Sequence, residues 1–288
     1  MSDSATRKPR SGLARRWPLS LDRIGRSAAA PGERTMTTAD AQTLRPQRPL
    51  SDALREANRL RAAPVPQSDL QAFRQNMVLR LRQAGCQDER VLAAMNAVPR
   101  HLFVDSALMA QAYEDTSLPI GLGQTISKPS VVARMIELLR HRPGGPDMAR
   151  VLEIGTGCGY QAAVLAQVAD RVVTIERLRG LHDRALRQLA PLQLPGLALV
   201  YGDGRLGHGP AAPYDGIIAA AGGHDLPAAW LDQLARGGRL VAPVHDPALR
   251  SQVLMVVDKL GDGSIVQRIH EAVRFVPLES GTSDFGHS

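Results

Sequence analysis

The sequence of 288 residues contains few cysteines, few aromatic side chains and no long apolar run. Its two cysteines, Cys86 and Cys158, belong to no CxxC pair or Cys/His cluster, so they indicate neither a disulfide framework nor a metal site. Two thiols in a chain of this size fit a reducing compartment, and we expect a cytoplasmic protein. Aromatic residues make up 3% of the chain, which argues against a stacking platform for single-stranded nucleic acid. Without about 18 consecutive apolar residues, no membrane span is predicted.

Excess charge of one sign is confined to the N-terminal segment. The net charge is +7, and residues 1–65 carry 13 basic and 6 acidic side chains. Basic and acidic residues therefore balance over the rest of the chain, which has no electrostatic reason to bind nucleic acid. The composition of residues 1–66 predicts a basic, disordered extension. Within it, Arg15-Arg16 lacks the apolar stretch of a twin-arginine export signal, and Met36 is a second candidate start.

Apolar residues at helical spacing predict three helices before the middle of the chain, over 68–85, 88–98 and 129–139. Ser68 and Asp88 are the expected N-caps of the first two, and Pro129 suits the first position of the third. A long connection, 100–128, precedes the third helix. No internal repeat is visible.

Farther along the chain, short apolar runs alternate with helical ones. Strands are expected at 150–154, 171–175, 197–201, 214–219 and 238–243, and helices at 160–168, 178–189 and 226–234. This alternation predicts a parallel sheet covered by helices on both faces. The segments 253–257 and 265–273, around Gly261-Asp262-Gly263, predict a closing antiparallel pair.

The most informative stretch is a glycine loop between a strand and a helix. It reads Val151-Leu152-Glu153-Ile154-Gly155-Thr156-Gly157-Cys158-Gly159-Tyr160. Glycine at every second position lets a ligand approach backbone N–H groups and the positive end of the following helix. Dinucleotide-binding proteins use the related GxGxxG spacing, so the loop alone leaves a nucleotide-dependent dehydrogenase open.

Further motifs follow the loop in a fixed order. They are Glu176 at the end of the second strand, Gly202-Asp203-Gly204, Tyr214-Asp215-Gly216-Ile217-Ile218 and Arg236-Gly237-Gly238-Arg239-Leu240. Together with the ExGxGxG loop, they resemble the class I S-adenosylmethionine-dependent methyltransferases. The resemblance implies an α/β, Rossmann-like fold: a central, mostly parallel seven-stranded sheet with helices on both faces and extra N-terminal helices. One departure is Ala219-Ala220-Ala221-Gly222-Gly223, where a more polar stretch is expected.

The same resemblance implies a binding site for S-adenosylmethionine. Its methionine portion would lie near the glycine loop, its ribose hydroxyls on Glu176 and its adenine near Asp203. The residues implied in cofactor binding are Gln124, Thr125, Glu153, Gly155, Gly157, Gly159, Glu176, Asp203 and Gly204. No metal is expected.

Segments outside the glycine loop indicate one family within this class. They are Val98-Pro99-Arg100-His101-Leu102-Phe103-Val104, Tyr113-Glu114-Asp115-Thr116, the stretch 118–129 and Glu271-Ala272-Val273-Arg274-Phe275-Val276-Pro277-Leu278. They are similar to the protein-L-isoaspartate O-methyltransferases, and the resemblance runs from about residue 70 to about 279. It implies methylation of the free α-carboxylate of isoaspartyl residues in damaged proteins, which starts their repair through a succinimide.

The family comparison also implies the roles of residues on the substrate side. Ser127 would lie beside the reacting carboxylate, with Ile126, Phe275 and Val276 along the peptide cleft. A carboxylate is ionised at neutral pH, so no strong general base is needed, and positioning alone can supply about 7–11 kcal/mol. A cap on the helix from Pro129 is a compatible second role for Ser127. Cys158 is assigned no chemistry.

Three other functions stay open at this point. One is a class I methyltransferase for another carboxylate or a small molecule, which would share the cofactor site. Another is a binding protein without catalysis, whose basic tail contacts nucleic acid or an acidic surface. A dehydrogenase is disfavoured by the GxGxG spacing and by the lack of a second catalytic domain. We expect a monomeric catalytic domain over 67–288 that acts on isoaspartyl proteins and contacts neither nucleic acid nor membrane.

Overall fold

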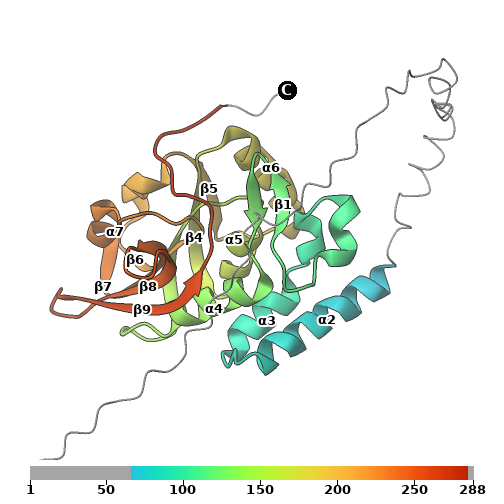
Figure 1. Cartoon of the computed structure of the whole chain (residues 1–288), viewed down its shortest axis with the longest axis horizontal. Coiled ribbons are helices and arrows are strands. Elements are labelled where there is room, and N and C mark those ends of the chain that lie inside the picture. The colour runs from blue at the N-terminus through green and yellow to red at the C-terminus, as the bar shows by residue number, and fades with distance from the viewer. Residues whose placement is uncertain (1–65, 285–288) are drawn as a thin grey trace, which may run out of the picture. The chain divides into compact units, whose positions relative to one another are not determined.

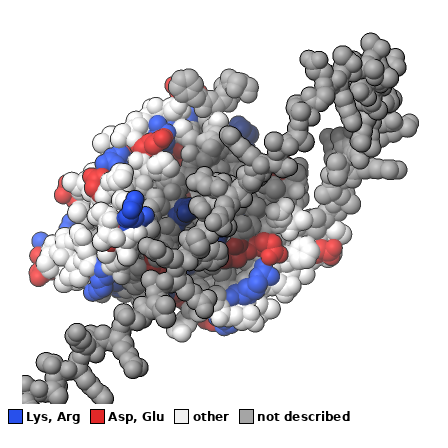
Figure 2. All heavy atoms as spheres, viewed as in Figure 1, with Lys and Arg blue, Asp and Glu red and all other residues white. Residues whose placement is uncertain are grey.

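The computed structural model describes residues 66–284 (Figure 1). The extension expected over 1–66 and the candidate start at Met36 lie outside the described residues, apart from Pro66. Within 66–284, no helix is both long and apolar enough to cross a membrane. On the face shown in Figure 2, the basic and acidic side chains of these residues are interspersed.

A seven-stranded sheet forms the centre of the fold, with the order β5-β4-β3-β6-β7-β8-β9. The strands are β3 (Met148–Ile154), β4 (Ala169–Glu176), β5 (Leu197–Tyr201), β6 (Tyr214–Ala219), β7 (Leu234–Asp246), β8 (Ser251–Lys259) and β9 (Ile265–Val273). The first five are parallel, and β8 and β9 close the sheet in antiparallel pairing. The predicted sheet is confirmed. Because β3 pairs with both β4 and β6, the strand order reverses beside it, where ligands of such sheets bind.

Alternation along the strands assigns side chains to the two faces of the sheet. Val151 and Ile218 belong to one apolar cluster, and their neighbours Leu152 and Ile217 belong to the other. The helices α4 (Pro129–Arg140), α5 (Tyr160–Leu165) and α6 (Arg179–Leu189) contribute to the first cluster. Trp230 of α7 (Ala228–Gln233) is buried in the second. Both faces are therefore covered, as expected.

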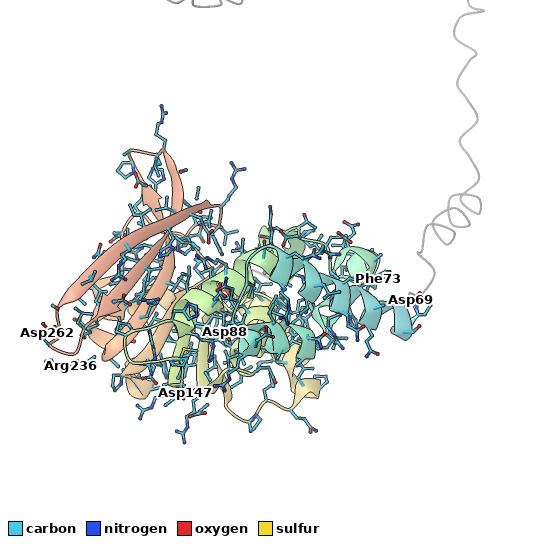
Figure 3. All side chains as sticks on the ribbon, turned by 90° about the horizontal axis from the view of Figure 1, so that it is seen from below. Asp69, Phe73, Asp88, Asp147, Arg236 and Asp262 are labelled. Atoms are coloured by element: carbon cyan, nitrogen blue, oxygen red, sulfur yellow. The ribbon has the colours of Figure 1, made fainter. Side chains whose placement is uncertain are left out.

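Two N-terminal helices, α2 (Gln67–Gln83) and α3 (Glu89–Ala97), pack beside α4 and α5. Asp88, labelled in Figure 3, caps α3 by accepting from the backbone N–H of Val91. Its other carboxylate oxygen lies 2.7 Å from Arg140 of α4. The prediction of Ser68 as a cap is wrong, because α2 begins one residue earlier and the Ser68 hydroxyl donates to Asp69.

The connection 100–128 is more regular than predicted. It contains the 3-10 helices η2 (Arg100–Phe103) and η3 (Ser106–Gln111) and a hairpin of β1 (Leu118–Gly121) and β2 (Gln124–Ile126). The three successive residues 121–123 of the hairpin turn have positive φ. Two of them are glycines, which adopt this conformation without strain. The apolar residues Leu118, Ile120 and Ile126 of this hairpin are buried.

After β9, the chain returns across the carboxyl ends of the parallel strands (Figure 1). This C-terminal segment, 274–284, pairs with the loop after β6, where Gly222 donates to Val276 and accepts from Leu278. Ser283 then donates to Arg177, just beyond β4. A Cβ at Gly222 would lie 2.5 Å from the Gln252 side chain of β8, so Gly222 makes room for Gln252, which accepts from the backbone N–H of Phe275 at 2.6 Å.

Candidate active site

A cleft lies at the carboxyl ends of β3, β4 and β6, with about 860 Å³ of empty space that is partly open to solvent. The glycine loop, the β1–β2 hairpin, the start of α6 and the C-terminal segment form its walls. Nine of the predicted site residues line it: Gln124, Thr125, Ile126, Ser127, Gly155, Gly157, Glu176, Gly204 and Val276.

The glycine loop follows β3 directly and depends on backbone conformations that glycine tolerates. Gly155, Gly157 and Gly159 have φ of +88°, +57° and +92°. A Cβ at Gly159 would lie 2.7 Å from Leu189, whereas one at Gly157 would meet only Ile120, at 3.3 Å. Gly159 is therefore needed for packing of α5, and Gly157 leaves backbone open to the cleft.

Glu176 ends β4 beside this loop. One carboxylate oxygen accepts from the backbone N–H of Gly157 at 2.8 Å, and the other accepts from Leu178 at 2.9 Å. Burial raises the pKa of the Glu176 carboxyl, although these N–H groups counteract the rise. Glu176 lines the cleft and a carboxylate can accept about four hydrogen bonds, so Glu176 can hold the loop and still accept hydroxyl hydrogens from a ligand.

A buried polar network lies behind the loop. Thr174 donates to Glu153 at 2.5 Å and contacts the Thr156 hydroxyl at 2.6 Å. Complete burial raises the pKa of Glu153 to about 8, although the Thr174 bond and the nearby Gln161 amide counteract the rise. Glu153 itself does not line the cleft. Its second oxygen and both amide atoms of Gln161 have no hydrogen-bond partner among residues 66–284.

Gln161 is a cleft residue that sequence analysis missed. It lies in the first turn of α5, is 7% exposed and lines the cleft. The sequence signal that could have identified Gln161 is its position two residues after Gly159, the last glycine of the loop. Both of its amide atoms are buried from solvent and lie near the Glu153 carboxyl, so Gln161 extends the polar network behind the loop to the cleft wall.

Besides Glu153, three other predicted residues lie outside the wall of the cleft. Gly159 is the N-cap of α5. Asp203 accepts from the backbone N–H of Arg205 at 2.8 Å and of Gly281 at 2.6 Å, so it ties the C-terminal segment to the end of β5. Phe275 lines a second groove next to the cleft.

Ser127 lies between this cleft and that groove. Its side chain makes no cap bond with α4, whose N-cap is Lys128, so the helix-cap alternative for Ser127 is wrong. Its carbonyl oxygen accepts from Arg100 at 2.7 Å. Cys158 also lines the cleft, but burial raises the pKa of its thiol to about 11, so it is no ready nucleophile.

Arg100 is fully buried and holds the backbone around Ser127. Its guanidinium donates to the carbonyl oxygens of Ala112 and Ser127, each at 2.7 Å, and lies 4.8 Å from the Tyr160 ring centre. Burial lowers the pKa of this guanidinium. It makes no ion pair with a carboxylate of the described residues, so three chain segments are joined through a single desolvated cation.

Comparison with known proteins agrees with this geometry. The family model for protein-L-isoaspartate(D-aspartate) O-methyltransferase (PCMT) matches residues 71–283. A protein-L-isoaspartate O-methyltransferase from Leptothrix cholodnii is 60% identical over 98% of this chain and 99% of its own. One from Methylibium petroleiphilum is 60% identical over 93% of this chain and 97% of its own.

Solved structures show the same fold. A protein-L-isoaspartate O-methyltransferase structure, 30% identical, superposes with a TM-score of 0.64 and covers 72% of this chain and 66% of that one. A second, from Plasmodium falciparum in complex with S-adenosyl-L-homocysteine, is 24% identical with a TM-score of 0.59 and covers 72% of this chain and 98% of that one. Because the family model matches most of this chain's length, the chain belongs to the protein-L-isoaspartate O-methyltransferase family.

Proposed function

We propose that this chain transfers a methyl group from S-adenosylmethionine to the free α-carboxylate of isoaspartyl residues in damaged proteins, which starts their repair through a succinimide. The family membership supports this activity. The observation that carries the proposal is the place of Ser127, on the rim shared by the cofactor cleft and the neighbouring groove. A peptide in that groove and a cofactor in the cleft would meet at this side chain.

The residues of the cleft fit S-adenosylmethionine. Glu176 offers free lone pairs to the ribose hydroxyls, and the open backbone at Gly157 leaves room for the methionine portion. Gln161, in the wall of the cleft, would lie near the polar amino-acid end. Gly204, next to Asp203, lines the end of the cleft that we propose for the adenine. Gln124 and Thr125 would close the cofactor from the hairpin side.

When bound, S-adenosylmethionine supplies an electrophilic methyl group, which the substrate carboxylate oxygen captures as the carbon–sulfur bond breaks, without any proton transfer. Ser127 would donate a hydrogen bond that orients this oxygen. Arg100 holds the Ser127 backbone in place. Ile126, Phe275 and Val276 would position the peptide along the groove.

We further propose that residues 67–288 form the catalytic domain and that it works as a monomer in the cytoplasm. One apolar cluster contains buried residues from Leu70 to Val256, and Val273 and Phe275 pack against it, which supports a single folded domain. Cys86 and Cys158 are buried free thiols, as a reducing compartment allows.

The test is transfer of labelled methyl from S-adenosylmethionine to an isoaspartyl peptide, with the matching aspartyl peptide as control. We expect base-labile label on the isoaspartyl peptide alone, because a methyl ester hydrolyses in base. Cofactor binding is measured in parallel. Bound cofactor without transfer to either peptide would contradict the substrate assignment and favour another carboxylate or a small-molecule acceptor.

A further inference from the structure

A second groove adjoins the cofactor cleft and encloses about 1280 Å³ of empty space that is partly open to solvent. The two hollows share Thr125, Ser127, Ala220 and Val276 as lining residues. Among the described residues that line the groove, the only charged side chains are Lys128 and Arg274. Both are cationic, so the groove presents charge of a single sign beside Ser127.

These two cations come from different parts of the fold. Lys128 is the N-cap of α4 and directly follows Ser127, whereas Arg274 directly follows β9. Both side chains are exposed, and neither makes an ion pair with a carboxylate among residues 66–284. They reach the groove from two elements that are far apart in the sequence.

The nearby carboxylates are engaged elsewhere. Asp115 accepts from the backbone N–H of Ser130 at 2.9 Å and from its hydroxyl at 2.8 Å. Glu271 accepts from Arg134 at 3.3 Å, on the outer side of α4. Asp115 keeps its charge in these bonds, but neither carboxylate pairs with Lys128 or Arg274, so both cations remain available to a molecule in the groove.

We propose that Lys128 and Arg274 make the groove select isoaspartyl peptides that carry acidic side chains next to the isoaspartyl residue. This inference rests on the proposed function and adds the substrate preference of the same site. The α-carboxylate of the isoaspartyl residue goes to Ser127, which leaves both cations to pair with flanking carboxylates. A half-enclosed groove screens such pairs less than open solvent does.

The expected size of the preference follows from known ion pairs. One exposed pair changes an equilibrium by roughly 1.5- to 5-fold, so two pairs together give a preference of roughly 2- to 25-fold, with about 10-fold inside that range. Repulsion of basic flanking residues adds to it in the same direction. Because the effect is electrostatic, it should decline as ionic strength rises.

The experiment compares three peptides with one central isoaspartyl residue, flanked on both sides by Glu, by Gln or by Lys. The kcat/KM for methyl transfer is measured with the full chain and with Lys128→Gln, Arg274→Gln and the double variant. Arg171→Gln is the matched control, because Arg171 is an exposed arginine near the amino end of β4, whereas the cleft lies at the carboxyl end of that strand. Melting temperatures show that each variant is folded.

We expect the unaltered chain to prefer the Glu-flanked over the Lys-flanked peptide by about 10-fold at low salt. Each single variant should reduce this ratio, the double variant should bring it close to one, and Arg171→Gln should leave it unchanged. Equal kcat/KM for the Glu- and Lys-flanked peptides in the unaltered chain would overturn the inference, as would a preference that survives in the double variant. Failure of the proposed function looks different, because none of the three peptides would be methylated.

Discussion

The two sides of the cleft are built in different ways. The cofactor side consists of the loop 155–159 and Glu176, which continue two central strands and bond to each other over short distances. The substrate side combines the β1–β2 hairpin, Ser127 and the C-terminal segment, of which the last lies about 150 residues beyond the first in the chain. The first side depends on local backbone geometry, and the second depends on long-range contacts.

Those long-range contacts are few and specific. Arg100 connects Ala112 and Thr116 with the backbone of Ser127. On the other wall, Arg177 pairs with Glu279 at 2.5 Å and donates to the carbonyl oxygen of Gly281. Damage to the cofactor side should therefore abolish ligand binding, whereas damage to the substrate side should alter turnover and stability.

The largest effect is expected from Gly157→Val. A branched side chain at φ +57° is strained and would enter the cleft beside Ile120, which should weaken binding of S-adenosylhomocysteine by more than about 100-fold. Calorimetry measures the affinity. Gly145→Val is the matched control, because Gly145 has φ +92° and no atom within 4 Å of an added Cβ. Gly157→Val protein that is folded and binds normally would refute the cofactor assignment.

The next effect is expected from Arg100→Met, which tests the support of the substrate side. Buried carbonyl oxygens of Ala112 and Ser127 would lose their donor, which should lower the free energy of unfolding by about 3 kcal/mol and kcat by about 10-fold. Denaturant unfolding and steady-state kinetics measure the two changes. Arg100→Lys should recover part of both. An unchanged kcat with reduced stability would limit Arg100 to a structural role.

Ser127→Ala isolates the chemistry from the support. Loss of one hydrogen bond to a carboxylate should reduce kcat by roughly 10- to 50-fold and leave cofactor affinity within about two-fold. Ser264→Ala, in the β8–β9 turn, is the control, since its hydroxyl bonds only Asp262 among the described residues. If Ser127→Ala turns over at the normal rate, Ser127 does not orient the substrate.

The smallest effect is a pH dependence of stability from Glu153. Its pKa is raised from 4.5 to about 8 in the folded protein, so the native state holds a proton that the unfolded chain has lost between these values. Stability from this group is therefore lost as pH rises from about 4.5 through about 8. Relative to the unaltered chain, Glu153→Gln should gain about 2 kcal/mol between pH 6 and pH 8. Parallel pH curves of unfolding free energy would show that Glu153 is ionised in the fold.

Much of the fold could be predicted because its signals are local. The expected strands 197–201 and 214–219 have the bounds of β5 and β6, and Asp88 and Pro129 begin their helices as predicted. The errors occurred where a local pattern is ambiguous. Ser68 has a capping side chain but lies inside the first turn. Each helix or strand between residues 100 and 128 is too short to show a periodic pattern of apolar residues.

The sequence by itself determined the family, the sheet and the cofactor side, since the glycine loop and Glu176 are read from contiguous motifs whose backbone geometry follows from residue type. Tertiary structure alone decided which distant residues support the two sides of the cleft. It showed that Asp203 holds Gly281, that Gln161 is buried without a partner and that Arg100 supports Ser127. Such contacts join residues far apart in the chain, and their energies come from burial and packing that no short stretch of sequence contains.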